Sequence, residues 1–178
     1  SNESKEIKTD NHISIIIPGM ISEKRREYIN LLKVINNFYS SCENSRIKFV
    51  FLGKLDKNNE SQIFASIEKI NGKYKDKIKY WDHFIPKEEF ENEINKADII
   101  LSNIRLISST KCIREKYGET KESGISYIVY KFAKPAIVPE THNLLQGFDK
   151  QVINFDTYDD LKELFIGLEN KKYNLLSL

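Results

Sequence analysis

The chain of 178 residues has few of the features that mark metal-binding, disulfide-bonded or strongly charged proteins. Its two cysteines stand 70 positions apart and its three histidines fall on separate segments, so neither residue type has the spacing of a zinc site or a disulfide framework. The formal net charge is only +2, too small for the basic surface that dominates nucleic-acid binding. No apolar run approaches the roughly 20 residues of a membrane-spanning helix. Metal chemistry, nucleic-acid binding and a membrane-spanning chain are therefore disfavoured.

Several common enzyme signatures are missing as well. There is no Gly-x-Ser-x-Gly turn, no Walker lysine loop and no Gly-x-Gly-x-x-Gly after the first apolar run, which weakens the usual dinucleotide and nucleoside-triphosphate interpretations. Hydrophobic residues make up 40% of the chain, enough for one domain with a self-sufficient core. Residues 1–11 lack both a methionine and an apolar stretch, so we expect a tag remnant or disordered lead there, followed by a single domain over residues 12–178.

Short apolar runs rich in β-branched residues alternate with helical patterns from His12 onward. The expected strands cover residues 12–19, 47–53, 78–81, 97–101, 135–138 and 152–155. The expected helices lie around residues 28–39, 63–72, from 86 onward, 125–132 and 157–168. Strands separated in this way imply right-handed βαβ units. The sequence therefore predicts an α/β fold, a doubly wound, Rossmann-like parallel sheet of about six strands with helices on both faces.

Local signals predict several helix ends and one long loop. Ser22 is placed to cap the first helix, and Asn71-Gly72 to end the second. Thr157 and Asp160 form an approximate capping box for the last helix. Residues 102–122 show no regular pattern, and a loop of this length in a small domain is usually functional. It follows a central strand, on the edge where such sheets bind ligands.

The turn after the first strand is a candidate anion site. The strand ends at Gly19, and the basic residues Lys24, Arg25 and Arg26 follow within one turn of the expected helix. Backbone N–H groups at a helix start attract phosphate, and nearby cations add to that attraction. The alternative is a basic helix start that only faces solvent, which applies to Lys24 more than to the two arginines.

The turn before the fourth helix, residues 117–124, is a second candidate. The small residues Ser123 and Gly124 would let a ligand approach the helix start, and Lys121 adds a mobile charge. Alternatively, Gly118 only makes a turn and Ser123 is only a cap. The first and fourth strands flank the point where a doubly wound sheet reverses its strand order, so we expect both turns to open into one crevice.

The order of these motifs resembles the C-terminal, nucleotide-sugar-binding half of GT-B glycosyltransferases of the group 1 type. The resemblance runs through nearly all of residues 12–170. The matching pieces are Ile17-Pro18-Gly19 with Arg25 and Arg26, Phe51-Leu52-Gly53, Lys96 to Leu101, Tyr117-Gly118, Ser123 to Tyr127, and Ala133 to Pro139. In relatives that carry the Tyr-Gly, Ser-Gly and Lys-Pro series, the spacing from Ser-Gly to Lys-Pro is the same as here.

The resemblance implies a donor-binding site. The basic residues after the first strand would neutralise the donor diphosphate, with Arg25 matching the family's phosphate-binding cation, and the base would pack near the ends of the second and third strands. The donor-binding set is Gly19, Arg25, Arg26, Tyr117, Gly118, Glu119, Lys121, Glu122, Ser123 and Gly124. Two positions depart from the family: Met20 replaces a usual arginine, and Ile128 replaces a glutamate that commonly grips the ribose, although Glu119 or Glu122 could substitute.

The activity that the resemblance implies is transfer of a sugar from a nucleoside-diphosphate sugar to a glycan or lipid-linked acceptor, as in bacterial surface polysaccharide synthesis. No cofactor and no metal is expected, and no residue of this chain is assigned a catalytic role. Catalysis would stabilise charge on the leaving nucleoside diphosphate. The acceptor site belongs to an N-terminal domain that 178 residues cannot contain, so this fragment alone is expected to be inactive. The full-length enzyme is expected in the cytoplasm. Peripheral association with the inner face of the membrane is an alternative that stays open.

Three other interpretations stay open. One is a non-catalytic Rossmann-like module that has lost the site, for which Met20 and Ile128 are the best support. Another is a subunit that needs a separate partner chain for activity. A third, a receiver-like signalling domain, is disfavoured because no acidic pair follows the first strand. Tyr117, Tyr127 and Tyr130 could stack on a base or sugar, but aromatic residues on a helix that faces a sheet are more often core.

Overall fold

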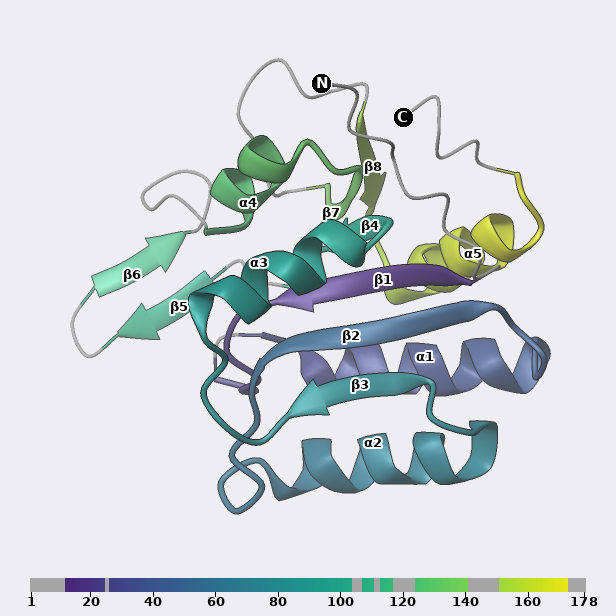
Figure 1. Cartoon of the computed structure of the whole chain (residues 1–178), viewed down its shortest axis with the longest axis horizontal. Coiled ribbons are helices and arrows are strands. Elements are labelled where there is room, and N and C mark those ends of the chain that lie inside the picture. Colours follow the sequence, from purple (N-terminus) through teal and green to yellow (C-terminus); the bar gives the residue numbers. More distant parts are fainter. Residues whose placement is uncertain are drawn as a thin grey trace.

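A parallel six-stranded sheet forms the centre of the computed structural model (Figure 1), which describes residues 12–24, 26–103, 107–110, 113–116, 124–140 and 151–172. The strands are β1 (Ile13–Pro18), β2 (Ile47–Lys54), β3 (Ile78–Trp81), β4 (Ile99–Leu101), β7 (Ala136–Pro139) and β8 (Val152–Phe155). Their order is β3-β2-β1-β4-β7-β8, and every pair is parallel. The predicted doubly wound α/β sheet is confirmed.

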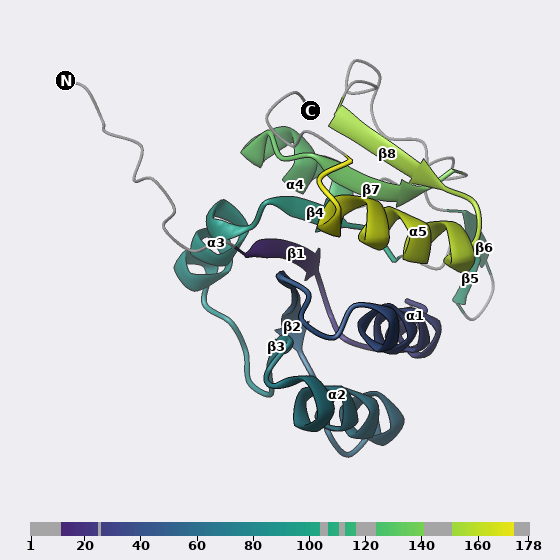
Figure 2. The ribbon, with the colours of Figure 1, turned by 90° about the vertical axis from the view of Figure 1, so that its right-hand side faces the viewer.

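Helices cover both faces of this sheet (Figure 2). The helices are α1 (Tyr28–Ser41), α2 (Ser61–Tyr74), α3 (Lys87–Lys96), α4 (Gly124–Phe132) and α5 (Tyr158–Glu169). Side chains of α1, α2 and α5 share one hydrophobic cluster with Ile15 and Ile17, whereas those of α3 and α4 share a second cluster with Ile16. Successive residues of β1 thus enter opposite cores, which explains why all six of its residues are buried.

The start of α5 is where local signals were read correctly. Thr157 is the N-cap, its side-chain oxygen accepts the Asp160 N–H at 3.1 Å, and the Asp160 carboxylate accepts the Thr157 N–H at 2.9 Å. This is the predicted capping box, and it satisfies two N–H groups that the helix itself leaves unpaired.

We expect Thr157→Ala to lower the free energy of unfolding by about 1 kcal/mol, the usual cost of removing an N-cap oxygen. The hydrogen bond from the Thr157 hydroxyl lowers the pKa of the Asp160 carboxyl. Because this pKa is lower in the folded state, the hydrogen bonds of the Asp160 carboxylate stabilise the fold at neutral pH. That stabilisation is lost as the pH falls through the lowered pKa. Urea unfolding at neutral pH checks the first effect, with Thr157→Ser as the variant that retains the cap.

Of two other predicted helix ends, the first was wrong and the second, expected near Asn71-Gly72, lies two residues further on. The first helix begins at Tyr28 rather than near Ser22, whose hydroxyl instead accepts the Lys24 N–H at 3.3 Å within a turn. The second helix continues past Gly72 to Tyr74 and ends where Lys75 adopts a left-handed conformation with φ of 59°. Propensity signals therefore identified these helices but not their ends.

Residues 102–122 were expected to form one irregular loop, and this was wrong in part. Strands β5 (Ile107–Thr110) and β6 (Ile113–Lys116) pair as an antiparallel hairpin. The hairpin projects beyond the edge at which the parallel strands end (Figure 1). Each strand has only four residues and mixes polar with apolar types, so the periodic signal was too short to detect.

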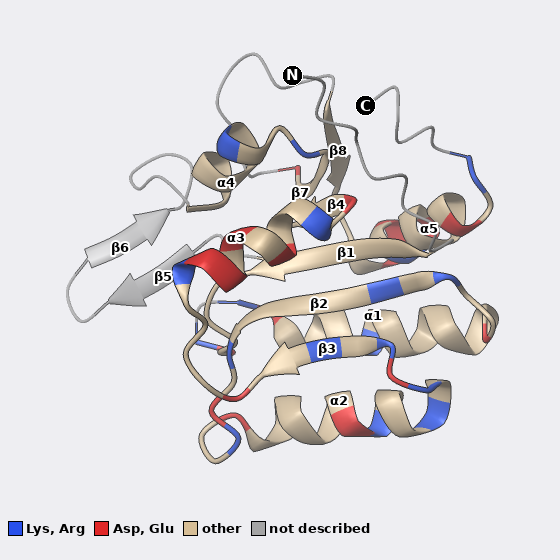
Figure 3. Cartoon of the chain, viewed as in Figure 1, with Lys and Arg blue, Asp and Glu red and all other residues tan. Residues whose placement is uncertain are grey.

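Charged residues of both signs are interspersed over the described chain (Figure 3). In α3 they follow the helix dipole, because Glu88 and Glu89 lie in the first turn and Lys96 in the last. Pro86, expected as the first helical residue, is the N-cap immediately before it. None of the helices in the described ranges is long and apolar enough to cross a membrane.

Candidate anion-binding site

The candidate site lies where the strand order of the sheet reverses. Strands β1 and β4 are neighbours, with β2 and β3 on one side and β7 and β8 on the other. Ligands of doubly wound sheets bind outside the carboxyl ends of the strands at such a reversal. The turn after β1 and the start of α4 both lie at this edge, as the sequence predicted (Figure 1).

A glycine turn ends β1. Gly19 has φ of +110°, a conformation that side chains with a Cβ rarely adopt, and its N–H donates to the Leu52 carbonyl at 2.9 Å. The turn presses against the end of β2, since a Cβ added to Gly53 would stand 2.1 Å from the Gly19 carbonyl oxygen. Within the described residues, the N–H of Met20 has no hydrogen-bond acceptor. The turn is thus fixed by β2 and presents a free amide at the edge of the sheet.

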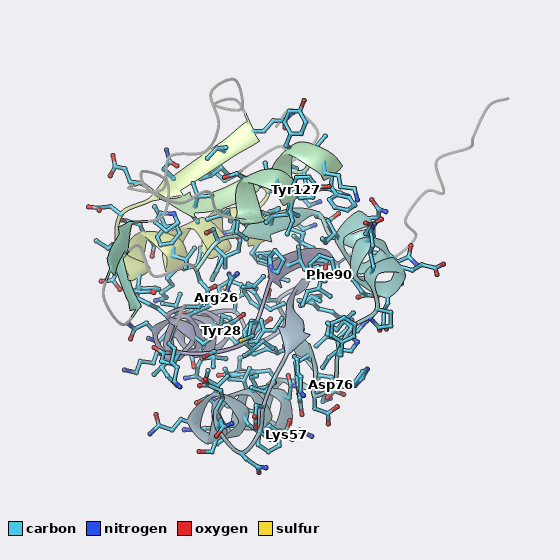
Figure 4. All side chains as sticks on the ribbon, turned by 90° about the vertical axis from the view of Figure 1, so that its left-hand side faces the viewer. Arg26, Tyr28, Lys57, Asp76, Phe90 and Tyr127 are labelled. Atoms are coloured by element: carbon cyan, nitrogen blue, oxygen red, sulfur yellow. The ribbon has the colours of Figure 1, made fainter. Side chains whose placement is uncertain are left out.

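Arg26 connects this turn to the end of β4. Its Nη1 donates to the Asn103 side-chain carbonyl at 3.4 Å. Its guanidinium covers Gly19 so closely that a Cβ there would stand 2.2 Å from Nη2. Figure 4, which faces the edge where the strands end, shows Arg26 close to the middle of that edge. The ion pairs formed among the described residues do not include Arg26, so its positive charge has no carboxylate partner.

The first turn of α1 was expected to carry the basic residues and to supply amides for phosphate, and the structure differs in where the basic residues lie. Lys24 and Arg26 precede the helix instead of lying on it. The Glu23 carboxylate already accepts the Ile29 N–H at 3.0 Å, and so occupies the helix start with a charge of the protein itself. This arrangement favours the Gly19 turn and Arg26 over the amides of α1 as contacts for an anion.

Hydrogen bonds hold the segment around Arg26 against two other elements. The Glu27 N–H donates to the Asn103 main-chain carbonyl at 3.2 Å, and the Tyr158 hydroxyl at the start of α5 donates to the Glu27 carboxylate. The rings of Tyr28 and Phe51 pack in a tilted arrangement with centroids 5.2 Å apart, and burial raises the pKa of the Tyr28 phenol to about 12. The tyrosine therefore stays neutral, and the segment is anchored on both sides of Arg26.

Of the second candidate turn, only Gly124 belongs to the described residues. It begins α4, and a Cβ added to it would meet nothing within 4 Å, so the free protein has no packing need for glycine there. The other predicted site residues lie outside the described residues; these are Arg25, Tyr117, Gly118, Glu119, Lys121, Glu122 and Ser123. For these residues the donor-binding assignment stays a prediction.

Residues of α4 separate into core and surface. Ile128 packs against the core beneath this helix, which fits an apolar residue at that position. Tyr127 and Tyr130 were expected to be core residues, and this was wrong, because they are 65% and 64% exposed. Tyr127 lies on the same side of the molecule as Arg26 in Figure 4. Among the described residues, no three His, Cys, Asp or Glu side chains are grouped to hold a metal ion.

Asn103 was missed by the sequence reasoning. It follows β4 by two residues and lies at the reversal point, yet its side chain is almost completely buried. The one feature of the sequence that could have indicated Asn103 is its position at the carboxyl end of a central strand.

No family model and no curated protein matches this sequence. Solved structures do match the fold. A trehalose-6-phosphate synthase, OtsA, gives a TM-score of 0.65 at 9% identity, over 94% of this chain and 37% of that chain. The synthase from Burkholderia multivorans gives 0.65 at 8% identity, over 93% and 36%. The N-terminal domain of a Candida albicans trehalose-6-phosphate phosphatase gives 0.61 at 15% identity, over 90% and 35%. The chain spans somewhat more than a third of these neighbours, and the similarity establishes a GT-B-like, Rossmann-type fold.

Proposed function

We propose that this chain is the donor-binding half of a GT-B glycosyltransferase of the group 1 type, which moves a sugar from a nucleoside-diphosphate sugar to an acceptor. The observation that carries the proposal is the position of Arg26, which lies over a glycine turn at the reversal point of the sheet and forms no ion pair with a carboxylate of the described residues. Two of the neighbours in fold are named as UDP-forming synthases, which favours the same ligand class.

The proposed chemistry places the donor diphosphate between the Gly19 turn and the start of α4. A guanidinium 4 Å from a phosphate contributes about 4 kcal/mol at an effective dielectric constant near 20, before the cost of desolvation. The same charge would stabilise the nucleoside diphosphate as it leaves the anomeric carbon. Beside Arg26 and Gly124, the proposed contacts come from Arg25, Tyr117, Gly118, Glu119, Lys121, Glu122 and Ser123.

A second half is part of this proposal. Acceptor binding and part of the catalytic apparatus would come from an N-terminal domain, since the chain spans somewhat more than a third of its neighbours in fold. Alone, this chain would bind donor weakly and transfer no sugar. The reaction that we propose for the full-length enzyme is a step of bacterial surface polysaccharide synthesis, in the cytoplasm or at the inner face of the membrane.

A second candidate function is a non-catalytic module with the same fold. Met20, at a position where the family usually has an arginine, is 62% exposed and carries no charge toward the crevice. Ile128, where the family commonly has a ribose-binding glutamate, is partly buried and packs against the core. Both departures favour a chain that has kept the fold and lost nucleotide binding.

Nucleotide titration separates these two functions. We expect UDP or GDP at a hundred times its dissociation constant to stabilise the chain by about 2.7 kcal/mol, seen as a rise in melting temperature. Arg26→Ala should lower the affinity tenfold to a hundredfold, because a hydrogen bond to a charged group contributes about 1.5 to 3 kcal/mol. Isothermal titration calorimetry of both proteins measures the ratio.

Lys73→Ala is the matched control for that experiment. Lys73 lies in the last turn of α2, far from the edge where the strands end, and its loss removes the same charge. Its affinity should stay within twofold of the original chain. Equal losses from both variants would reject a phosphate site at Arg26, and no stabilisation by UDP, GDP, CMP or ADP would favour the non-catalytic module.

A further inference from the structure

Asn103, two residues after β4 at the reversal point of the sheet, has an unused pair of hydrogen-bond donors. The residue is 4% exposed, and both of its oxygens are engaged. The main-chain carbonyl accepts the Glu27 N–H at 3.2 Å, and Oδ1 accepts Arg26 Nη1 at 3.4 Å. Its Nδ2 is buried and has no hydrogen-bond partner. The end of this side chain therefore lies beside Arg26 with both N–H groups unpaired.

No hydrogen bond within the protein accounts for this buried amide. Nearly all buried polar side-chain atoms in proteins have a partner, because a buried donor without an acceptor costs free energy. The orientation is fixed by Arg26, since a flipped amide would direct its N–H donors at the donors of the guanidinium. The bond to Arg26 is also long for a guanidinium and a carbonyl oxygen, so positioning of Arg26 is a weak reason for an asparagine here.

We propose that Nδ2 of Asn103 donates to a phosphoryl oxygen of the ligand, so that Asn103 and Arg26 hold one oxyanion from two sides. The inference deepens the proposed function and rests on it. Both groups are hydrogen-bond donors, and Arg26 forms no ion pair within the described part of the chain. A phosphoryl group accepts hydrogen bonds at several oxygens and balances the charge of the arginine. A cation is repelled by this arrangement.

The proposal requires Arg26 to move when the oxyanion binds. The guanidinium rests on Gly19, and Nδ2 is closed to solvent in the free protein. When the oxyanion binds, the Arg26 side chain turns from Gly19 toward it, and this movement uncovers Nδ2. The long bond from Nη1 to Asn103 is weak and is readily exchanged for a charge-assisted bond to phosphate.

Nuclear magnetic resonance of ¹⁵N-labelled protein tests this contact directly. The side-chain amide signals of Asn103 are identified by their loss in Asn103→Asp, and the Arg26 Nε signal by its loss in Arg26→Lys. Inorganic pyrophosphate is expected to move the Asn103 signals downfield and to slow their exchange with water. Uridine, which has no phosphate, should leave them unchanged.

An affinity measurement adds a matched pair of variants. Asn103→Leu has a similar volume, no N–H donor and no charge, and should lower the affinity for pyrophosphate by more than about tenfold. Asn58→Leu, in the exposed turn after β2, makes the same replacement at the same edge and should cause a smaller loss. Equal losses would overturn the inference.

The outcomes separate the inference from the proposed function. If pyrophosphate moves the Arg26 signal at saturation while the Asn103 signals stay in place, the inference is overturned and the phosphate site at Arg26 stands. If neither signal moves at millimolar pyrophosphate, both the inference and the diphosphate site fail. Movement of both signals supports both.

Discussion

Gly53→Ala is expected to lower the free energy of unfolding by about 3 kcal/mol, the upper end of the usual cost of overpacking. The added Cβ would stand 2.1 Å from the carbonyl oxygen of Gly19 and 2.7 Å from its carbonyl carbon. Both are backbone atoms, so no rotation of a side chain relieves the contact. The end of β2 and the turn after β1 must instead move apart. Urea unfolding of the two proteins measures the difference.

Gly72→Ala is the matched control for this prediction. Gly72 lies inside α2, and a Cβ there would meet nothing within 4 Å. Alanine in an open helix position is expected to raise stability by about 0.5 to 1 kcal/mol. The two glycine replacements should therefore have opposite signs. A loss of similar size at both positions would mean that the close approach of Gly53 to Gly19 is not the cause.

The consequence of Gly53→Ala reaches the candidate site. The turn that must move carries Gly19, on which the Arg26 guanidinium rests. Where the variant still folds, its affinity for nucleoside diphosphate should fall although no proposed ligand contact has been replaced. Addition of UDP would then restore less stability than it gives to the original chain.

The sheet could be predicted from the sequence because its strands are buried on both faces. β1 carries Ile15, Ile16 and Ile17 in succession, and all three are completely buried. In an α/β domain, a strand that is apolar on both faces is stable only when a layer of helices covers each face. Short runs separated by helices then determine the parallel pairing. The hairpin of β5 and β6 had no such signal, because its four-residue strands contain no continuous apolar run in their sequence.

Helix ends were harder to predict because partners distant in sequence determine them. The Ile29 N–H near the start of α1 is satisfied by Glu23, six residues earlier, and not by a hydroxyl at the N-cap. The N–H of Glu23 is itself held by Glu60 at 3.3 Å, in the turn before α2. A rule that reads only neighbouring residues places the cap at Ser22 and therefore starts the helix too early.

The candidate site was predictable as a place and only in part as a set of residues. The reversal rule located the turn at Gly19 and the start of α4 from strand order alone. It could not find Asn103, because the property that singles out this residue is a buried donor without an acceptor. That property exists only when β4, Arg26 and the segment before α1 are placed together in space.

Phe165→Ala is expected to have the largest effect, a loss of about 3 to 5 kcal/mol in the free energy of unfolding. Phe165 is completely buried on α5, and its ring meets Phe38 of α1 at 5.7 Å and Phe49 of β2 at 5.1 Å in edge-to-face geometry. The substitution removes the buried apolar contacts of the ring and leaves a cavity between α5, α1 and β2. These three elements cannot all move inward to fill the cavity. Denaturant unfolding measures the loss.

Phe84→Ala is the control of the same residue type, since Phe84 is 79% exposed and its replacement should change stability by less than about 0.5 kcal/mol. The two variants also differ in what they do to the crevice. Phe165 anchors the helix whose first residue, Tyr158, donates to Glu27 beside Arg26. Loosening α5 should therefore weaken nucleotide binding even at temperatures below the unfolding transition. If the folded Phe165→Ala protein instead binds nucleotide with the affinity of the original chain, β4 and Asn103 alone hold the Arg26 segment in place.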